Sequence, residues 1–284
     1  MRACATAPPA FDLQTDDLTQ TDNHAMAALP GFSLARRLAA GETVYTGWCG
    51  LPAPIVAETI AREGFNTVTI DQQHGLWDTE ATVTAITAIR AVGAAPVVRV
   101  PLGAFAAASR SLDFGAEGII APMINTVADA KAFVSATKFP PLGERSWGPM
   151  RAMTLAGIND PKAYLRDANQ NIVTLAMIET KTAMANLDAI AAVPGIDVLF
   201  VGPSDLSIGL SDGKELDPHS PTVEAALDKI VEACRKAGKI AGLYCVNAER
   251  ALACAKRGIR FLAVGSDLGF LRAGTAAQLK MLKG

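Results

Sequence analysis

Residues 66–78 read N-T-V-T-I-D-Q-Q-H-G-L-W-D, and the rest of the chain is best interpreted from this stretch. Its β-branched run, 68–70, ends in Asp71 and, three residues later, His74, after which Gly75 breaks the pattern and a helix is expected near residue 78. Polar side chains thus follow a buried strand, at the end where barrels of alternating strands and helices carry their active sites. His74 and Asp71 fit a general base and its orienting carboxylate. A surface histidine beside an unrelated acid explains them equally well.

Eight apolar runs alternate with helical patterns along the chain. The predicted strands are 43–48, 66–71, 95–100, 118–122, 172–179, 197–201, 240–245 and 260–264. The predicted helices are 33–41, 55–63, 79–91, 105–114, 127–137, 182–192, 222–237, 248–256 and 271–282. Near-continuous apolar strands indicate a parallel sheet covered on both faces. Eight such units in 284 residues predict an α/β fold, the (β/α)8 TIM barrel.

The composition excludes several kinds of partner. Basic residues number 26 and acidic residues 28, so a net charge of −2 points to neither nucleic acid nor an anionic membrane. Residues 33–284 are predicted to form one barrel domain. Residues 1–32 are predicted to be a disordered extension, because they fit neither a signal peptide nor a membrane span. Five cysteines without close pairing favour the cytoplasm over an oxidising compartment.

One segment, 139–171, is too long and irregular for an ordinary helix-to-strand connection. It contains P-P-L-G-E-R-S-W-G-P-M-R-A, with Arg145, Trp147 and Arg151. Long loops in compact domains are often functional, so these side chains are candidates for binding an anionic substrate or a neighbouring subunit. Alternatively, the segment is a surface loop without a binding function.

Polar residues end several of the predicted strands and would converge on one face of a barrel. Trp48 ends the first strand, and Arg99 lies inside the third, in V-V-R-V-P. A buried arginine is costly unless it is paired, so Arg99 indicates either a functional site or a structural salt bridge. Glu179 ends the fifth strand and Asp205 follows the sixth in G-P-S-D-L-S. Two carboxylates without clustered Cys or His suit Mg²⁺ or Mn²⁺, although Asp205 alone also fits a helix N-cap.

Several longer motifs resemble one known family. They are E-T-I-A-R-E-G-F-N-T-V-T-I-D-x-x-H, V-V-R-V, I-I-A-P-M, G-E-R, I-E-T-x-x-A-x-x-N-L-D-x-I and G-I-D-V-L-F-V-G-P-S-D-L-S. Together they resemble the HpcH/HpaI aldolase and citrate lyase family, and within it the class II pyruvate aldolases. The resemblance runs from about residue 33 to residue 282. It implies a phosphoenolpyruvate/pyruvate-type barrel and a metal-dependent lyase that reversibly cleaves 4-hydroxy-2-oxo acids through a metal-bound enolate. The products would be pyruvate, or a related 2-oxo acid such as hydroxypyruvate, and an aldehyde.

The resemblance also implies roles for individual residues. Glu179 and Asp205 match the ligands of a divalent cation, Mg²⁺ or Mn²⁺ and possibly Co²⁺ in this family. Arg99 matches the arginine that holds the pyruvyl oxygen, and His74 matches the general base with Asp71 as its partner.

Three further residues match positions around the substrate. Trp48 matches an aromatic lining of the aldehyde side, and Ser204 the residue before the metal aspartate. Asp113 matches an acid that reaches a neighbouring subunit's histidine in a homohexamer with exchanged C-terminal helices. Met177 and Gln73 depart from the family pattern, which has Gln and an acid there.

Two other functions remain open from the sequence. A CoA-thioester lyase of the citrate or malyl-CoA type would use the same metal and arginine. A non-catalytic barrel that binds a small oxo acid would keep the same polar groups without turnover. No lysine at the strand ends is placed to form a Schiff base, which disfavours the class I route.

Overall fold

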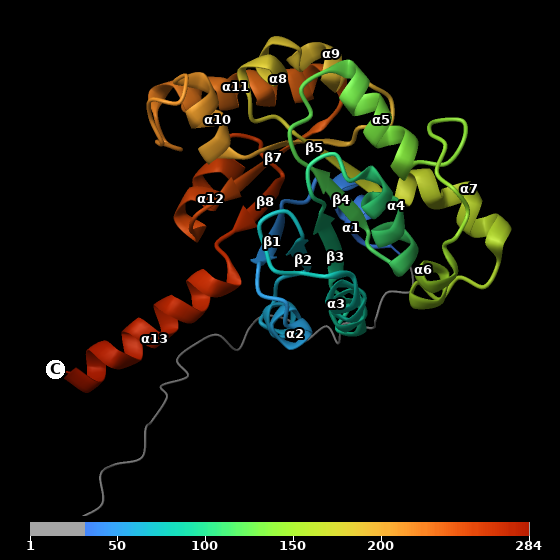
Figure 1. Cartoon of the computed structure of the whole chain (residues 1–284), viewed down its shortest axis with the longest axis horizontal. Coiled ribbons are helices and arrows are strands. Elements are labelled where there is room, and N and C mark those ends of the chain that lie inside the picture. The colour runs from blue at the N-terminus through green and yellow to red at the C-terminus, as the bar shows by residue number, and fades with distance from the viewer. Residues whose placement is uncertain (1–31, 284) are drawn as a thin grey trace, which may run out of the picture.

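The chain folds into a closed barrel of parallel strands. A computed structural model describes residues 32–283. Neighbouring strands pair in chain order, and β8 pairs with β1 to close the barrel (Figure 1). The strands are β1 (Val44–Cys49), β2 (Thr67–Asp71), β3 (Ala95–Arg99), β4 (Gly118–Ala121), β5 (Val173–Met177), β6 (Val198–Val201), β7 (Ile240–Cys245) and β8 (Phe261–Val264). The predicted TIM barrel is confirmed.

Helices surround the barrel, and α13 projects away from it (Figure 1). Proline occupies the first turn of α2, α7, α10 and α11, where its missing N–H removes no helical hydrogen bond. The helices are α1 (Leu34–Ala39), α2 (Pro54–Arg62), α3 (Thr79–Ala91), α4 (Phe105–Phe114), α5 (Val127–Thr137), α6 (Met150–Leu155), α7 (Pro161–Asn171), α8 (Lys181–Ala185), α9 (Leu187–Ala191), α10 (Pro203–Leu210), α11 (Pro221–Ala237), α12 (Ala248–Lys256) and α13 (Asp267–Lys283).

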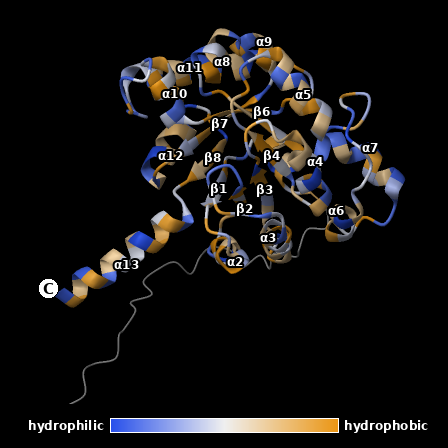
Figure 2. Ribbon diagram, in the orientation of Figure 1, coloured by the Kyte–Doolittle hydropathy of each residue, from blue (hydrophilic) through white to orange (hydrophobic). Residues whose placement is uncertain are grey.

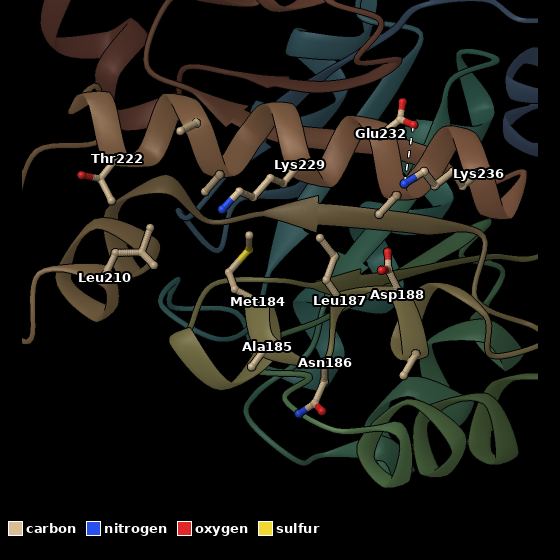
Figure 3. A pocket seen from close by; sticks show the side chains of 14 residues that line it. Met184, Ala185, Asn186, Leu187, Asp188, Leu210, Thr222, Lys229, Glu232 and Lys236 are labelled. Carbon is tan, nitrogen blue, oxygen red and sulfur yellow. Dashed lines mark ion pairs between the residues drawn. The ribbon is translucent and has the colours of Figure 1, made fainter.

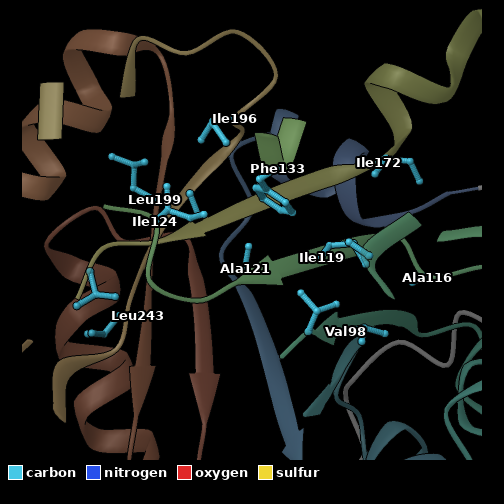
Figure 4. Close-up of a cluster of buried hydrophobic side chains, with 14 of the residues drawn as sticks. Val98, Ala116, Ile119, Ala121, Ile124, Phe133, Ile172, Ile196, Leu199 and Leu243 are labelled. Carbon is cyan, nitrogen blue, oxygen red and sulfur yellow. The ribbon is translucent and has the colours of Figure 1, made fainter. Parts of the chain in front are cut away.

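Apolar side chains form two packed layers. Figure 2 shows orange, apolar residues on the strands of the barrel, whereas orange and blue residues alternate along the surrounding helices. The outer layer lies between strands and helices, where Ile119 of β4 and Leu199 of β6 share a cluster with Phe133 of α5 (Figure 4). The inner layer fills the barrel itself and includes Leu34 and Leu38 from α1. Because α1 fills the barrel interior from the N-terminal side of the strands, the C-terminal ends are left for a site.

A buried carboxylate fixes α1 in that position. Glu117 Oε2 accepts hydrogen bonds from the backbone N–H of Ser33 at 2.6 Å and of Leu34 at 2.8 Å. Its other oxygen, Oε1, accepts from Arg90 Nη1 at 2.6 Å. A negative charge at a helix N-terminus also interacts favourably with the helix dipole. The ion pair between Arg90 and Glu117 therefore has a structural role. It lies at the N-terminal end of the barrel, opposite the end where the polar residues gather.

The structure differs from the predicted elements in three places. The single helix 182–192 is wrong: the chain forms α8 and α9, broken at Asn186, whose side chain donates a hydrogen bond to Asn125 O at 2.9 Å. The segment 139–171 is less irregular than predicted, because it contains α6 and α7. No helix was predicted directly after β6, where the structure has α10.

Some predictions fall outside the part of the chain that the structure describes. The extension predicted for residues 1–32 lies outside it except for Phe32, which is buried. Within residues 32–283 no helix has the length and apolar character needed to cross a membrane.

Candidate active site

A cavity of about 310 Å³ opens at the C-terminal ends of the strands. Six of the eight predicted site residues line it, and they come from β1, β2, β3, α10 and the loop after β2. The lining residues are Trp48, Asp71, His74, Arg99, Met177, Phe200, Gly202, Pro203, Ser204, Asp205 and Tyr244. The polar residues that follow the strands therefore lie together around one cavity, as the sequence predicted.

Asp71 and Arg99 form a buried, two-pronged ion pair. The register of β2 and β3 places the two residues directly opposite each other. Arg99 Nε lies 2.8 Å from Asp71 Oδ1, and Arg99 Nη2 lies 2.7 Å from Oδ2. Burial raises the pKa of Asp71, but the hydrogen bonds and charge of Arg99 outweigh this effect and hold the pKa below its ordinary value. The guanidinium is thus fixed in the cavity wall.

Trp48 supports the same pair from β1. Its Nε1 donates to Asp71 Oδ2 at 3.2 Å, and the Arg99 Cζ atom lies 4.8 Å from the centre of the indole ring. Two more aromatic rings surround the indole: Phe200 stacks on it with centroids 6.1 Å apart, and Tyr244 meets it edge-on at 5.4 Å. One side of the cavity is therefore a rigid aromatic wall.

His74 lies at the mouth of the cavity and is exposed. Asp71 Oδ1 accepts from the backbone N–H of Gln73 at 3.0 Å and of His74 at 3.3 Å. Within the described residues, no hydrogen bond joins the imidazole of His74 to Asp71, so their pairing as base and orienting carboxylate stays a prediction. Both carboxylate oxygens of Asp71 already accept hydrogen bonds from the side chains of Arg99 and Trp48 and from the backbone N–H groups of residues 73 and 74. Asp71 positions the backbone that carries His74.

Glu179 does not line the cavity but lies next to Gly202, which does, and one of its carboxylate oxygens is unpaired. The residue is buried, and its Oε1 accepts from the Met123 N–H at 2.8 Å. Its Oε2 is buried without a hydrogen-bond partner within residues 32–283. Burial raises the pKa of Glu179 to about 7; the Met123 N–H opposes this and the charge of Asp205 adds to it. A buried carboxylate in this condition is stabilised as an anion by a nearby cation.

Asp205 is the second acid near Glu179. It lies in the first turn of α10, whose N-cap residue is Gly202, so the alternative interpretation of Asp205 as an N-cap is wrong. No group of three or more His, Cys, Asp or Glu suited to a metal occurs in the described part of the chain. Two carboxylates with free coordination positions fit a hard divalent cation that also binds water and substrate oxygens. The donor set is therefore compatible with the predicted metal.

The sequence of this chain is similar to those of known proteins over most of its length. A family model described as HpcH/HpaI aldolase/citrate lyase matches residues 45–273. The chain belongs to this family. A hydroxypyruvate/pyruvate aldolase of Rhizorhabdus wittichii is 37% identical over 233 residues, which cover 82% of this chain and 91% of that protein. A 2-keto-3-deoxy-L-rhamnonate aldolase of Salmonella gallinarum is 33% identical over 260 residues, or 91% and 96% of the two chains.

A solved structure agrees with these relatives. An HpcH/HpaI aldolase/citrate lyase family protein from Burkholderia cenocepacia superposes with a TM-score of 0.80 and 32% identity, covering 88% of this chain and 99% of that one. The predictions of the family and of a lyase with aldolase chemistry are therefore confirmed.

Asp113 lies apart from the cavity of this HpcH/HpaI family member. Its Oδ1 accepts from Arg145 Nη2 at 2.6 Å, and Arg145 is buried. Trp147 packs against Phe139 and Tyr164. Neither these residues nor Arg151, which donates to Thr87 Oγ1 at 2.8 Å, lines the cavity. The prediction that the segment 139–171 binds substrate is thus wrong within one subunit, and its contact with a neighbouring subunit stays a prediction.

The sequence interpretation missed Tyr244, Phe200 and Gly202. Tyr244 and Phe200 are the last residues but one of β7 and β6, the same position that Trp48 has in β1. Because side chains alternate along a strand, this shared position was a usable signal for residues that point into the barrel. Gly202 gave no such signal, since its importance depends on the side chain of Glu179.

A larger cavity lies outside the barrel. It measures about 710 Å³ and separates α11 from α8 and α9 (Figure 3). Lys229 and Met184 line it, and Lys236 Nζ lies 3.8 Å from Glu232 Oε1. None of the predicted site residues, all of which the structure describes, belongs to this cavity. It lacks the combination of guanidinium, imidazole and carboxylates found at the strand ends.

Proposed function

We propose that this chain is a divalent-metal-dependent aldolase that reversibly cleaves 4-hydroxy-2-oxo acids. The products are pyruvate, or a related 2-oxo acid such as hydroxypyruvate, and an aldehyde. The observation that carries the proposal is one small cavity that is lined by the fixed guanidinium of Arg99 and by Asp205, with the buried carboxylate of Glu179 next to Gly202 in its wall. The aldolase relatives support it.

Glu179 and Asp205 would hold the cation. When bound there, Mg²⁺ or Mn²⁺, or Co²⁺, supplies a Lewis acid that polarises the keto group of the 2-oxo acid. The unpaired Oε2 of Glu179 is the atom that most needs this charge. Asp71 keeps Arg99 in place, so the guanidinium presents a preorganised positive charge to the oxygen that becomes negative when the carbon–carbon bond breaks.

His74 would move the proton. Its exposed imidazole at the cavity mouth accepts the proton of the substrate's 4-hydroxyl during cleavage and returns it during addition. Ser204 lines the cavity beside Asp205, and its hydroxyl contributes a polar group next to the carboxylate pair. No lysine lines the cavity within residues 32–283, so the chain's own residues offer no Schiff base.

The first test is pyruvate release from 4-hydroxy-2-oxo acids, including 4-hydroxy-4-methyl-2-oxoglutarate. We expect no release after EDTA treatment and restored release with Mg²⁺, Mn²⁺ or Co²⁺. Cation binding should also raise the thermal unfolding temperature, because a ligand that binds only the folded state stabilises it. Cleavage of a malyl or citramalyl thioester without any pyruvate release would instead assign the thioester lyase. Metal binding without turnover of either substrate would assign a binding protein.

His74→Ala should slow aldol cleavage by about 10²–10⁴-fold, the usual contribution of a positioned acid or base. It should slow the decarboxylation of oxaloacetate much less, because that reaction removes no hydroxyl proton. The ratio of the two rates is the measurement, and both are taken on the same metal-loaded preparation. Equal losses in both reactions would remove His74 from proton transfer.

Assembly is the remaining part of the proposal. α13 extends from the barrel with Leu271, Leu279, Met281 and Leu282 exposed (Figure 1). Apolar side chains along a projecting helix fit contact with another subunit, and the family resemblance predicts a homohexamer with exchanged C-terminal helices. We expect light scattering to give six subunits for the full chain and fewer after truncation at residue 268. A monomeric full chain would contradict this.

A further inference from the structure

We propose that Asp267 is a positioning residue that holds His74 in place through the loop 49–51. The inference rests on the proposed aldolase function, since it concerns the proton transfer assigned to His74. Asp267 lies in the first turn of α13, outside the cavity, and is buried. Hydrogen bonds and close backbone packing connect it to the turn that carries His74.

The turn that carries His74 packs directly on the loop 49–51. The backbone N–H of Leu76 donates to the carbonyl of Gly50 at 2.9 Å. Gly75, the residue after His74, lies so close to this loop that a Cβ atom there would be 2.9 Å from Gly50 O and 3.0 Å from Gly50 Cα. Glycine permits this approach because it has no Cβ atom. A shift of the loop 49–51 would therefore move the backbone next to His74.

The position of His74 depends on the backbone on either side of it. Within residues 32–283 its imidazole makes no hydrogen bond of its own. On the strand side, Asp71 Oδ1 accepts from the backbone N–H of His74 at 3.3 Å. On the other side, the buried indole of Trp77 donates through Nε1 to the carbonyl of Cys49 at 2.8 Å. The loop after β1 is thus one of two supports for the exposed imidazole.

Asp267 fastens this loop to the base of α13, the helix that projects from the barrel (Figure 1). Its Oδ2 accepts from the backbone N–H of Leu51 at 2.8 Å. Such a bond is charge-assisted and stronger than one between neutral groups. A Cβ atom on Gly50 would lie 3.8 Å from Asp267 Oδ1 and 3.9 Å from Gly75 Cα, so Gly50 is enclosed between the carboxylate and the turn that carries His74.

The helix α13 has a cap that does not involve Asp267. Ser266 Oγ accepts from the backbone N–H of Gly269 at 3.2 Å, as a serine N-cap does. Within the helix, Asp267 accepts from the N–H of Leu268 at 2.7 Å, whereas its other oxygen bonds to the loop 49–51. Burying a carboxylate is costly unless it is well hydrogen-bonded. The bond outside the helix therefore indicates a role for Asp267 beyond capping.

The test compares two reactions of each metal-loaded variant. Cleavage of 4-hydroxy-4-methyl-2-oxoglutarate uses His74, and decarboxylation of oxaloacetate removes no hydroxyl proton. We expect Asp267→Ala to lower the ratio of the two kcat values, cleavage to decarboxylation, by at least about tenfold, because a misplaced base transfers the proton poorly. Ser266→Ala, the matched control on the same helix, removes the cap and should leave the ratio within about twofold of wild type. A wild-type ratio in Asp267→Ala, or the same shift in both variants, would overturn the inference.

Two further substitutions at the same position separate the hydrogen bond from the stability of the helix. Asp267→Asn keeps an oxygen acceptor for the N–H of Leu51 and should recover most of the ratio. Asp267→Ser covers the case in which alanine prevents folding, because serine is favoured at helix N-termini but is too short to reach Leu51. It should give the shift expected for alanine. A wild-type ratio in Asp267→Ser, or no recovery in Asp267→Asn, would overturn the role of Asp267.

A double variant shows whether Asp267 acts through His74. Once His74→Ala has removed the imidazole, Asp267→Ala should change the cleavage rate by no more than about twofold, since effects that depend on one group do not add. A loss as large as in the wild-type background would make the role of Asp267 purely structural. Additive losses in a chain that cleaves the substrate would overturn this inference alone. A wild-type chain that cleaves no 4-hydroxy-2-oxo acid under any metal would overturn the proposed function as well.

Discussion

Arg99→Ala is expected to lower the turnover number for aldol cleavage by about 10²–10³-fold while the divalent cation still binds. Arg99 is the one fixed cation in the cavity wall among the described residues, and Asp71 and Trp48 hold it in a single orientation. A charge that is oriented before the reaction begins stabilises the developing enolate without reorganisation. Steady-state cleavage of a 4-hydroxy-2-oxo acid and a Mn²⁺ titration measure the two effects separately.

The variant also leaves a buried acid without its partner, so it needs a control. Asp71 is buried, and an unpaired buried charge costs about 3–5 kcal/mol of folding free energy. The double variant Arg99→Ala with Asp71→Asn removes that charge and should recover part of the stability but not the turnover. Arg99→Lys keeps a cation and loses the two-pronged geometry, so it should fall between wild type and alanine. Turnover near the wild-type value in the stable double variant would eliminate Arg99 from the chemistry.

The stability part of this effect depends on pH in a definite direction. Arg99 lowers the pKa of Asp71, so the ion pair stabilises the folded state at every pH above the unfolded-state pKa, about 3.9. The difference in unfolding free energy between wild type and Arg99→Ala is therefore fully present at neutral pH. This difference becomes smaller as the pH falls below about 4, and it disappears once the pH is below the lowered pKa of Asp71 in the folded state. Urea unfolding at several pH values measures it.

The barrel and the convergence of polar residues were predictable from the sequence for a simple reason. Parallel strands buried on both faces read as apolar runs, and their C-terminal ends meet at one face. Arg99 stood out because a charge inside such a run needs a partner. Its partner follows from the register of β2 and β3, which pairs residue 71 with residue 99. That register is a long-range property, so Asp71 was assigned only to the nearby His74.

The remaining errors have the same origin in tertiary contacts. The helix 182–192 breaks because Asn186 bonds to Asn125, which is distant in sequence. The acid Asp205 resembled an N-cap because the local pattern G-P-S-D does not reveal that the helix begins at Pro203. Hydrophobic periodicity describes how one element faces the core, and it carries no information on which loop an element contacts.

Gly202→Ala is expected to weaken Mn²⁺ binding by about 10–100-fold and to reduce turnover accordingly. A Cβ atom at this position would lie 2.3 Å from Glu179 Oε2 and 2.9 Å from Met177 Cε. The backbone of Gly202 has φ −90° and ψ 95°, which alanine adopts without strain, so the effect comes from the contact alone. Glycine thus leaves space for the carboxylate oxygen that has no hydrogen-bond partner in residues 32–283.

Gly209→Ala is the matched control because it lies on the same helix, α10. Its Cβ would meet Glu179 O at 3.5 Å and Thr180 Cα at 3.5 Å, which are ordinary contacts. Alanine inside a helix is about 1 kcal/mol more favourable than glycine, so this variant should be at least as stable as wild type and should bind Mn²⁺ normally. Calorimetric titration without substrate compares the two variants. If both bind Mn²⁺ alike, the carboxylate of Glu179 is not the group that needs the space at Gly202, and Glu179 loses its place among the metal ligands.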